Sequence, residues 1–320
     1  MKILFNRILY GTILIIGMVI LNFSLFFLSP GDPTNLYFSP RVKKEQLQMM
    51  KQKMGVDRSW FVQLKNWCFH IAKGDLGYSW AKHRPVAEIL KEAIPATLQL
   101  TILALIINLT LGCVIGMIAG INSKSWFGKI INLTTIVTYS VPIFLLALFL
   151  IYLFSLKLTI FPPSGMNSFL LEGAGFWFKF WDRARHIFLP VLTLSVIGAA
   201  ATSRYVEEQV KAVLKQDYIR MAIAKGLTKK QVYFSHAFKN AILPVLTLLG
   251  MYFPFLLGSA FVVEVIFAWP GMGRMTFEAI FSKDYPVLMA ANLIAGIMVI
   301  AGNLISDLLY RFFDPRIQIK

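Results

Sequence analysis

The sequence predicts an all-α membrane protein with six transmembrane helices, and composition and pattern both lead to this class. Of the 320 residues, 57% are hydrophobic and only 15% are charged, whereas soluble domains average about 45–50% apolar and about 25% charged residues. The mean hydropathy is +0.64. The apolar residues gather in runs long enough to cross a bilayer, which takes roughly 20 residues. This composition excludes a disordered chain, a collagen and an ordinary soluble enzyme.

The expected spans are six apolar runs, and each is near or above the length that a bilayer requires. The first run follows Lys2 and Arg7, but it exceeds a signal-peptide core and no small-x-small cleavage site follows it, so we expect an uncleaved helix. An even number of spans places both termini on the same side of the membrane. The runs are residues 8–28, 97–121, 131–156, 187–203, 241–268 and 287–310.

The basic residues predict that this side is the cytoplasm. Segment 31–96 is too long to obey the positive-inside rule and is left out of the comparison. Of the other Lys and Arg residues, 15 fall on the side of the termini and 6 on the opposite side. The net charge of +16 then reflects insertion topology and contact with membrane lipid. We expect no nucleic-acid partner, because the sequence has no basic module with interleaved aromatic residues.

These spans divide the chain into four parts. Residues 1–30 form an N-terminal transmembrane helix, and residues 31–96 form an extracytoplasmic insertion. Residues 97–310 form a five-helix core with a cytoplasmic loop at 204–240, and residues 311–320 form a cytoplasmic tail. Within the insertion we expect a helix at 45–54, a turn at 74–77 and a short amphipathic helix at 85–94 that enters the second span.

The second span carries glycines at every fourth position, Gly112, Gly116 and Gly120. This spacing lets helix backbones approach closely, so it favours a helix–helix seam over the alternative of unrelated glycines in a membrane helix.

No catalytic constellation is visible, and we expect no enzyme activity, no cofactor and no metal site. The chain has no Gly-x4-Gly-Lys-Ser/Thr phosphate loop, no His-Glu-x-x-His motif and no Gly-x-Ser-x-Gly motif. Its four histidines are scattered, and its two cysteines, Cys68 and Cys113, are far apart in sequence. Binding of ATP is therefore not expected of this chain alone.

Four residues are candidates for a translocation path. Glu264 is an ionisable residue near the outer end of the fifth run. It is part of the substrate path or a gate, or alternatively a charge at the membrane interface. Ser140, Pro142 and Ser259 are small or helix-breaking residues in the third and fifth runs, and a broken helix can expose carbonyl groups to a hydrated cavity. The alternative for the two serines is a hydrogen bond to a carbonyl one turn earlier.

The cytoplasmic loop 204–240 is the most informative segment, with eight Lys and Arg residues against three acidic ones. The sequence predicts a short helix at 218–225, ended by Gly226 in a positive-φ conformation. Thr228 should cap a second helix that returns to the membrane. From the residues alone, a helix pair that transmits force and a basic loop that faces lipid are equally consistent.

This loop resembles the "EAA" loop of inner-membrane permeases of binding-protein-dependent ABC importers, in the dipeptide, oligopeptide and nickel branch. The resemblance lies in Ala222-Ile-Ala224-Lys225-Gly226-Leu227-Thr228 and in His236-Ala237-Phe238-Lys239-Asn240-Ala241. Arg220, Met221 and His236 depart from the general motif in the manner of this branch. Further motifs of the branch occur in order along nearly the whole chain, at 30–33, 74–79, 85–86, 95–98, 163–165, 269–274, 284–287, 303–307 and 314–316.

The resemblance implies a type I ABC importer permease fold (MetI-like) in a bacterial inner membrane. It also implies a second homologous permease that completes the pore, two cytoplasmic ABC ATPases and an extracytoplasmic solute-binding protein. The residues implied in coupling to an ATPase are Tyr218, Arg220, Met221, Ala222, Ala224, Lys225, Gly226 and Leu227.

The implied cargo is di- or oligopeptides, with nickel or a metallophore as the alternative. An ion channel or a membrane enzyme is the alternative of another class. A channel would need a selectivity filter or a charged ring, an enzyme would need a polar cluster at membrane depth, and the sequence shows neither.

Overall fold

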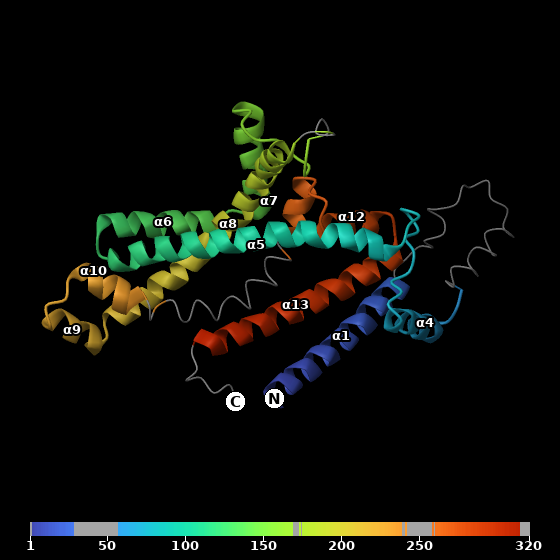
Figure 1. Cartoon of the computed structure of the whole chain (residues 1–320), viewed down its shortest axis with the longest axis horizontal. Helices are drawn as coiled ribbons and strands as arrows, with labels where there is room; N and C mark the ends of the chain where they lie inside the picture. The colour runs from blue at the N-terminus through green and yellow to red at the C-terminus, as the bar shows by residue number, and fades with distance from the viewer. Residues whose placement is uncertain are drawn as a thin grey trace. The chain divides into compact units, whose positions relative to one another are not determined.

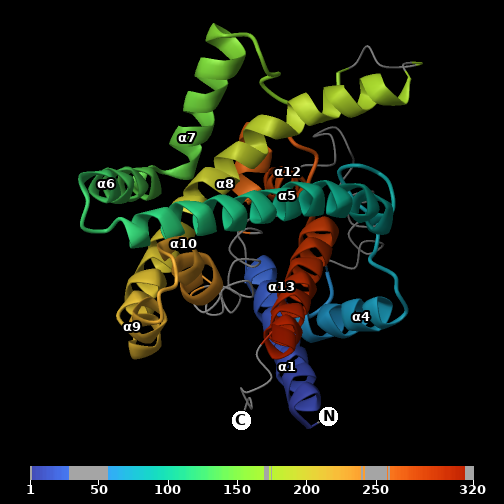
Figure 2. The ribbon, with the colours of Figure 1, turned by 60° about the vertical axis from the view of Figure 1, so that its left-hand side comes forward.

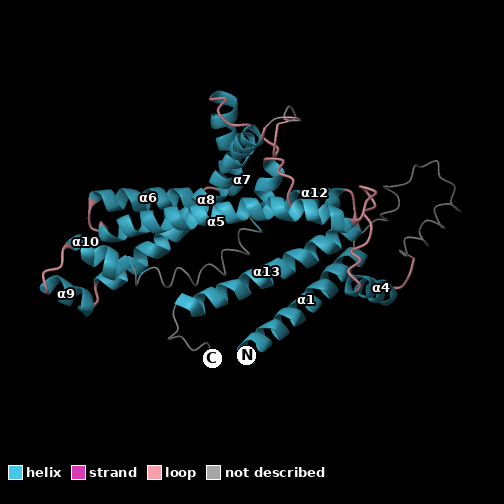
Figure 3. Ribbon diagram, in the orientation of Figure 1, coloured by secondary structure: helices cyan, strands magenta, loops and turns pink. Residues whose placement is uncertain are grey.

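The computed structural model describes residues 2–28, 57–168, 173, 175–238, 241, 258 and 260–313. These residues form helices joined by turns and loops (Figure 3), with an isolated β-bridge between Tyr78 and Pro85. The chain divides into two compact units. The first comprises Met1–Ala96 and Gly271–Ile300, and the second comprises Thr97–Pro270 and Ala301–Lys320.

In the first unit, the first and last helices of the chain lie side by side. Helix α1 (Lys2–Leu28) runs alongside α13 (Tyr285–Phe313), as Figure 1 shows. The pairing is close, because a Cβ added to Gly11 would come within 3.0 Å of Ile300. The Asn292 amide Nδ2 also donates to Asn22 Oδ1 at 3.0 Å. Helices α4 (Trp60–Ala72) and α12 (Met272–Phe281) and the first turns of α5 (Val86–Ile121) complete the unit.

A buried carboxylate ties segment 79–81 to the start of α13. Asp284 is only 1% exposed, and it accepts hydrogen bonds from the Ser79 hydroxyl and from the backbone N–H groups of Trp80 and Ala81. We call these residues the Asp284 clasp. The hydrophobic core beside it joins the start of α5 to α12 and α13 through Val86, Ile89, Leu90, Ala93, Met272, Met275, Ala279, Val287, Leu288, Ala290 and Ala291.

The second unit is built around α8 (Phe176–Leu214). Helix α6 (Trp126–Ser140) packs against α8 (Figure 1). Helix α7 (Ile143–Leu150) continues as a π-helix, η1 (Ile151–Lys157). After α8 come the short helices α9 (Asp217–Ala224) and α10 (Lys229–Gln231) and the π-helix η3 (Val232–Phe238).

The predicted glycine seam is confirmed, and its partner is α8. A Cβ added to Gly116 would lie 2.4 Å from the Ser203 carbonyl oxygen, and one added to Gly120 would lie 2.7 Å from Val210. The contact is reciprocal, because a Cβ added to Gly198 of α8 would lie 2.6 Å from the Asn108 amide. Real Cβ atoms do not approach so closely, so α5 and α8 reach this separation only with glycine at these positions.

Four described helices are long and apolar enough to cross a membrane, with a fifth if the bent pair of α6 and the α7–η1 segment is one span. The expected third span at 131–156 is broken, because α6 and the α7–η1 segment meet at an angle of 99°. Pro142 has no N–H to donate and holds Val141 in an extended conformation, with φ −74° and ψ 125°.

Two other spans are longer than expected. The fourth lies within the 39-residue α8. The second begins at Val86, because the short helix expected at 85–94 runs into it without a break as the start of α5. Most of the expected fifth span, at 242–257 and 259, and the expected helix at 45–54 lie outside the described residues. The number of six spans therefore stays a prediction.

Candidate functional sites

The predicted helix–glycine–helix loop is present in the second unit. Helix α9 begins after Gln216, with the favourable acidic residue Asp217 in its first turn. It ends at Ala224, and Gly226, the residue after the C-cap Lys225, has a φ of +84°. The Gly226 N–H donates to the Ile223 carbonyl at 2.9 Å, and the Leu227 N–H donates to the Ala222 carbonyl at 3.3 Å. This pair of bonds is the Schellman arrangement, which requires a left-handed residue at the glycine position.

The second helix of the loop is capped as predicted. The Thr228 hydroxyl accepts from the Gln231 N–H, while the Gln231 side chain accepts from the Thr228 N–H at 3.0 Å. This reciprocal capping box fixes the start of α10, which continues directly into η3. The side chain of His236, within η3, lies outside the described residues.

Helix α9 has one face fixed to its own unit. Ile219 and Ala222 are 1% and 7% exposed and share a core with Val232 and Ala237 of η3. The end of α8 packs against the same core through Val213 and Leu214. Helix α9 and the end of α8 therefore share one packed core, and packed side chains transmit strain.

The other faces of α9 are exposed. Of the eight residues implied in coupling, Ala222 is buried and Leu227 is half-buried, and the remaining six, Tyr218, Arg220, Met221, Ala224, Lys225 and Gly226, are exposed. Met221 is 57% exposed, and the neighbouring Ile223 is 58% exposed. Tyr218 and Ile223 flank the buried strip on opposite sides, and Met221 lies beyond Tyr218. We call Tyr218, Met221 and Ile223 the exposed apolar residues of α9.

Three of the four path candidates lie in the second unit, at two different places, and the fourth lies outside the described residues. Ser140 and Pro142 lie together at the break between α6 and α7 and are exposed. The Ser140 hydroxyl donates to the Ile136 carbonyl at 2.9 Å, which is the back-bonded alternative. Glu264 is fully buried and accepts a hydrogen bond from the Thr97 hydroxyl at 2.6 Å. Ser259 lies outside the described residues.

A buried carboxylate that the sequence analysis did not single out joins α6 to α8. Glu207 is only 4% exposed. It accepts from the Asn132 amide at 3.2 Å and pairs with the Lys211 ammonium group at 2.6 Å. The i,i+4 spacing of Glu207 and Lys211 was a signal in the sequence, but the partner on α6 was not. We call these two contacts the Glu207 bridge. The bridge links α6 to α8, whose end shares a core with α9.

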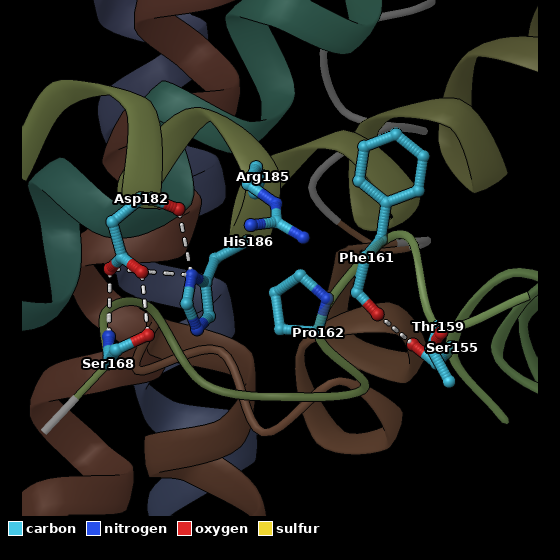
Figure 4. A pocket seen from close by; sticks show the side chains of 8 residues that line it. All are labelled: Ser155, Thr159, Phe161, Pro162, Ser168, Asp182, Arg185 and His186. Carbon is cyan, nitrogen blue, oxygen red and sulfur yellow. Dashed lines mark hydrogen bonds and ion pairs between the residues drawn. The ribbon is translucent and has the colours of Figure 1, made fainter. Parts of the chain in front are cut away.

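The second unit also has a cavity of about 280 Å³, shown in Figure 4, to which no sequence pattern pointed. The charged side chains that line the cavity form hydrogen bonds with other groups of the chain. The Asp182 carboxylate accepts from the Ser168 N–H at 2.8 Å and from its hydroxyl at 2.6 Å, and the Arg185 guanidinium donates to the Ile160 carbonyl at 2.6 Å. The cavity is lined by Ser155, Thr159, Phe161, Pro162, Ser168, Asp182, Arg185 and His186. Over the described ranges of the chain, no group of three His, Cys, Asp or Glu residues could hold a metal ion.

Known proteins resemble this chain over almost its whole length. Residues 112–319 match the family described as the inner membrane component of binding-protein-dependent transport systems, and residues 1–101 match the N-terminal family of the same membrane components.

Relatives share about a third of their residues with the chain. The oligopeptide transport system permease protein AppB of Bacillus subtilis is 34% identical, with 98% of each chain covered. The dipeptide transport system permease protein DppB of Alkalihalophilus pseudofirmus is also 34% identical, again with 98% of each chain covered. A putative peptide permease protein of Brucella suis is 35% identical at the same coverage.

The family performs transport and not catalysis, and its description names an inner membrane component of a binding-protein-dependent transport system. Such a component works with a solute-binding protein and an ATPase. The all-α architecture and the several helices able to cross a membrane agree with a multi-pass protein of the inner membrane. The chain therefore belongs to the family of inner-membrane permease components of binding-protein-dependent ABC importers.

Proposed function

We propose that this chain is the permease subunit of an ABC importer of di- and oligopeptides. It forms half of the transmembrane path, and a second homologous permease supplies the other half. Two cytoplasmic ATPases drive transport, and an extracytoplasmic binding protein delivers the peptide. The names of the relatives support peptide as cargo, since they specify oligopeptides, dipeptides or peptides and not nickel.

The observation that carries the proposal is the set of exposed apolar residues of α9. Tyr218, Met221 and Ile223 are large apolar side chains, and they are 41–58% exposed on a helix whose buried strip is already packed. Three large apolar side chains exposed on one short, fixed helix mark an interaction surface. We assign α9 as the element that docks on the ATPase, together with Arg220, Ala224, Lys225 and the cap at Gly226 and Leu227.

The contacts around α9 supply a route from the ATPase to the spans. The shared core couples α9 to the end of α8, the Glu207 bridge couples α8 to α6, and the glycine seam couples α8 to α5. The ATPases and the peptide would each stabilise one of two arrangements of these helices, which is what alternating access requires.

The path itself is proposed to run past Ser140, Pro142, Ser259 and Glu264. The break at Pro142 leaves backbone groups without helical partners, and such groups occur at membrane depth only in protein or beside a hydrated cavity. The termini and loop 204–240 are proposed to be cytoplasmic, and segment 31–96 extracytoplasmic.

Photo-cross-linking tests the docking role of α9. A benzophenone maleimide is attached to Met221→Cys in a background lacking Cys68 and Cys113, and the complex is reconstituted with its ATPases. We expect cross-links to the ATPase from position 221 and none from Lys124→Cys, an exposed position in another loop. Equal cross-linking from both positions, or none from position 221 in an assembled complex, contradicts the docking role.

Uptake assays with the same proteoliposomes test the cargo. With the binding protein and ATP present, a labelled di- or oligopeptide should accumulate, and Ni²⁺ should not. Accumulation of Ni²⁺ without peptide would reassign the importer to the nickel group.

A further inference from the structure

Helix α4 has an apolar surface that its own unit leaves open. The helix has 13 residues, and none of them is buried. One stripe, comprising Trp60, Leu64, Trp67 and Ile71, is half-buried. On another side, Phe61, Val62 and Phe69 are 68%, 40% and 58% exposed. A helix that is apolar over most of its circumference is stable only when it is covered on more than one side.

The polar side chains of α4 are confined to a narrow strip. Gln63, Asn66 and His70 follow one another at helical spacing and so share one side of the helix. Lys65 lies between Phe61 and Phe69, where its long apolar stem can cover neighbouring apolar surface while the ammonium group reaches water. A polar strip beside a wide aromatic and aliphatic surface is the pattern of a helix that lies in a membrane interface.

The contacts of α4 fix its depth relative to the membrane. The Trp60 ring packs edge-on against Phe23, with 6.1 Å between the ring centroids. Phe23 belongs to the candidate span Leu9–Leu28, five residues before its end, or roughly 7 Å along the helix axis. Figure 1 shows α4 beside this end of α1, and Figure 2 shows that it runs across α1 and not along it.

Other aromatic residues mark the same level. Tyr285, the first residue of α13, packs against Phe26 at 5.6 Å and against Trp80 at 5.8 Å between ring centroids. Trp and Tyr gather at membrane–water interfaces, because their rings have an apolar body and a polar edge. The end of α1, the start of α13 and α4 therefore belong to one interfacial layer.

We propose that α4 lies in the membrane interface at the end of α1, with Phe61, Val62 and Phe69 inserted among the lipid acyl chains. At about 20 Å, a helix of this length is too short to span a bilayer whose apolar core is about 30 Å thick. Lipid is the occupant that α1 already meets, since only 6% of its span is buried in the protein. The apolar surface of α4 continues that lipid contact into the interface. Part of the extracytoplasmic insertion expected at 31–96 is thus an in-plane anchor.

Spin labelling tests this placement in the assembled transporter, reconstituted into liposomes of phosphatidylethanolamine and phosphatidylglycerol. Single nitroxides replace Phe61, Phe69 or Asn66 in a background lacking Cys68 and Cys113. Collision rates are measured with oxygen, which concentrates in lipid, and with a water-soluble nickel chelate. Position 13 on α1 serves as the lipid reference, and ATPase activity confirms that each labelled complex is assembled.

We expect oxygen collisions to dominate at positions 61 and 69, as at position 13, and chelate collisions to dominate at position 66. Each alternative occupant gives a different result. Chelate dominance at positions 61 and 69 means that this surface faces water, and low rates with both reagents mean that protein covers it, either residues 29–56 or another subunit. Both results overturn the proposal, and the two aromatic positions report independently if one label disturbs the fold.

Discussion

At the scale of single residues, Gly226 offers a clean test of the coupling loop. No atom lies within 4 Å of a Cβ built at this position, so a substitution acts through the backbone φ of +84° alone. A β-branched residue is strained there by about 1–3 kcal/mol. We expect Gly226→Val to displace the α9 cap and to separate ATP hydrolysis from peptide uptake, measured together in proteoliposomes.

The matched control is Gly226→Asn, since asparagine tolerates the left-handed conformation far better than valine. It should retain most of the uptake. Wild-type transport by Gly226→Val would show that the cap geometry is not required.

Asp284 is the second informative residue, because its buried carboxylate accepts hydrogen bonds from three donors. Asp284→Ala leaves the N–H groups of Trp80 and Ala81 without this acceptor, and an unsatisfied buried group costs about 1–3 kcal/mol. We expect a lower thermal midpoint of the purified complex and faster proteolysis in segment 57–85. Ser79→Ala removes one donor but leaves the carboxylate in place, so its effect should be smaller. An equal loss in the two variants would argue against the Asp284 clasp.

At the scale of elements, the seam between α5 and α8 depends on the absence of side-chain volume. Gly116→Ala places a Cβ against the backbone of Ser203, which cannot move without displacing α8. Overpacking of this kind costs about 1–3 kcal/mol. We expect a lower yield of assembled complex and a lower thermal midpoint by size-exclusion chromatography after heating. Gly17→Ala in α1 is the control, because no atom lies within 4 Å of its added Cβ; equal damage in both variants would show that the seam is not the cause.

At the scale of the whole molecule, the topology is open to direct measurement. In intact cells of a strain without Cys68 and Cys113, a membrane-impermeant maleimide should label Lys73→Cys and should leave Lys124→Cys unlabelled until lysis. Both positions are exposed, and the predicted topology places them on opposite sides of the membrane. The reverse pattern would invert the topology, and labelling of both positions in intact cells would break the six-span arrangement.

The local sequence predicted loop 204–240 closely, because helix caps and helix-ending glycines depend on contacts within four or five residues. Helix α9 lies at Asp217–Ala224 against the expected 218–225, and Gly226 and Thr228 have the expected backbone conformation and cap. The family resemblance, drawn from motifs along the chain, is confirmed by the matches at 1–101 and 112–319. The coupling and path roles of individual residues stay predictions.

The third span shows where sequence periodicity stopped being sufficient. The apolar run at 131–156 predicted a span, and Pro142 within it was a candidate helix-breaking residue. Proline can kink a membrane helix or end it, and the choice depends on whether neighbours satisfy the freed backbone groups. Here the packing of α6 against α8 resolves the choice in favour of a 99° break.

The sequence by itself determined the membrane class, the positions of most spans, the caps of the coupling loop and the glycines of the close helix seam. These features depend on composition and on neighbours within one or two helical turns. Only the tertiary structure decided that Asp284 meets Ser79, that Glu207 bridges to Asn132, and that Glu264 is fully buried beside Thr97. The partners in these pairs are 205, 75 and 167 residues apart in sequence. No local pattern specifies such pairs, because the burial that makes a polar partner necessary arises only when the helices pack.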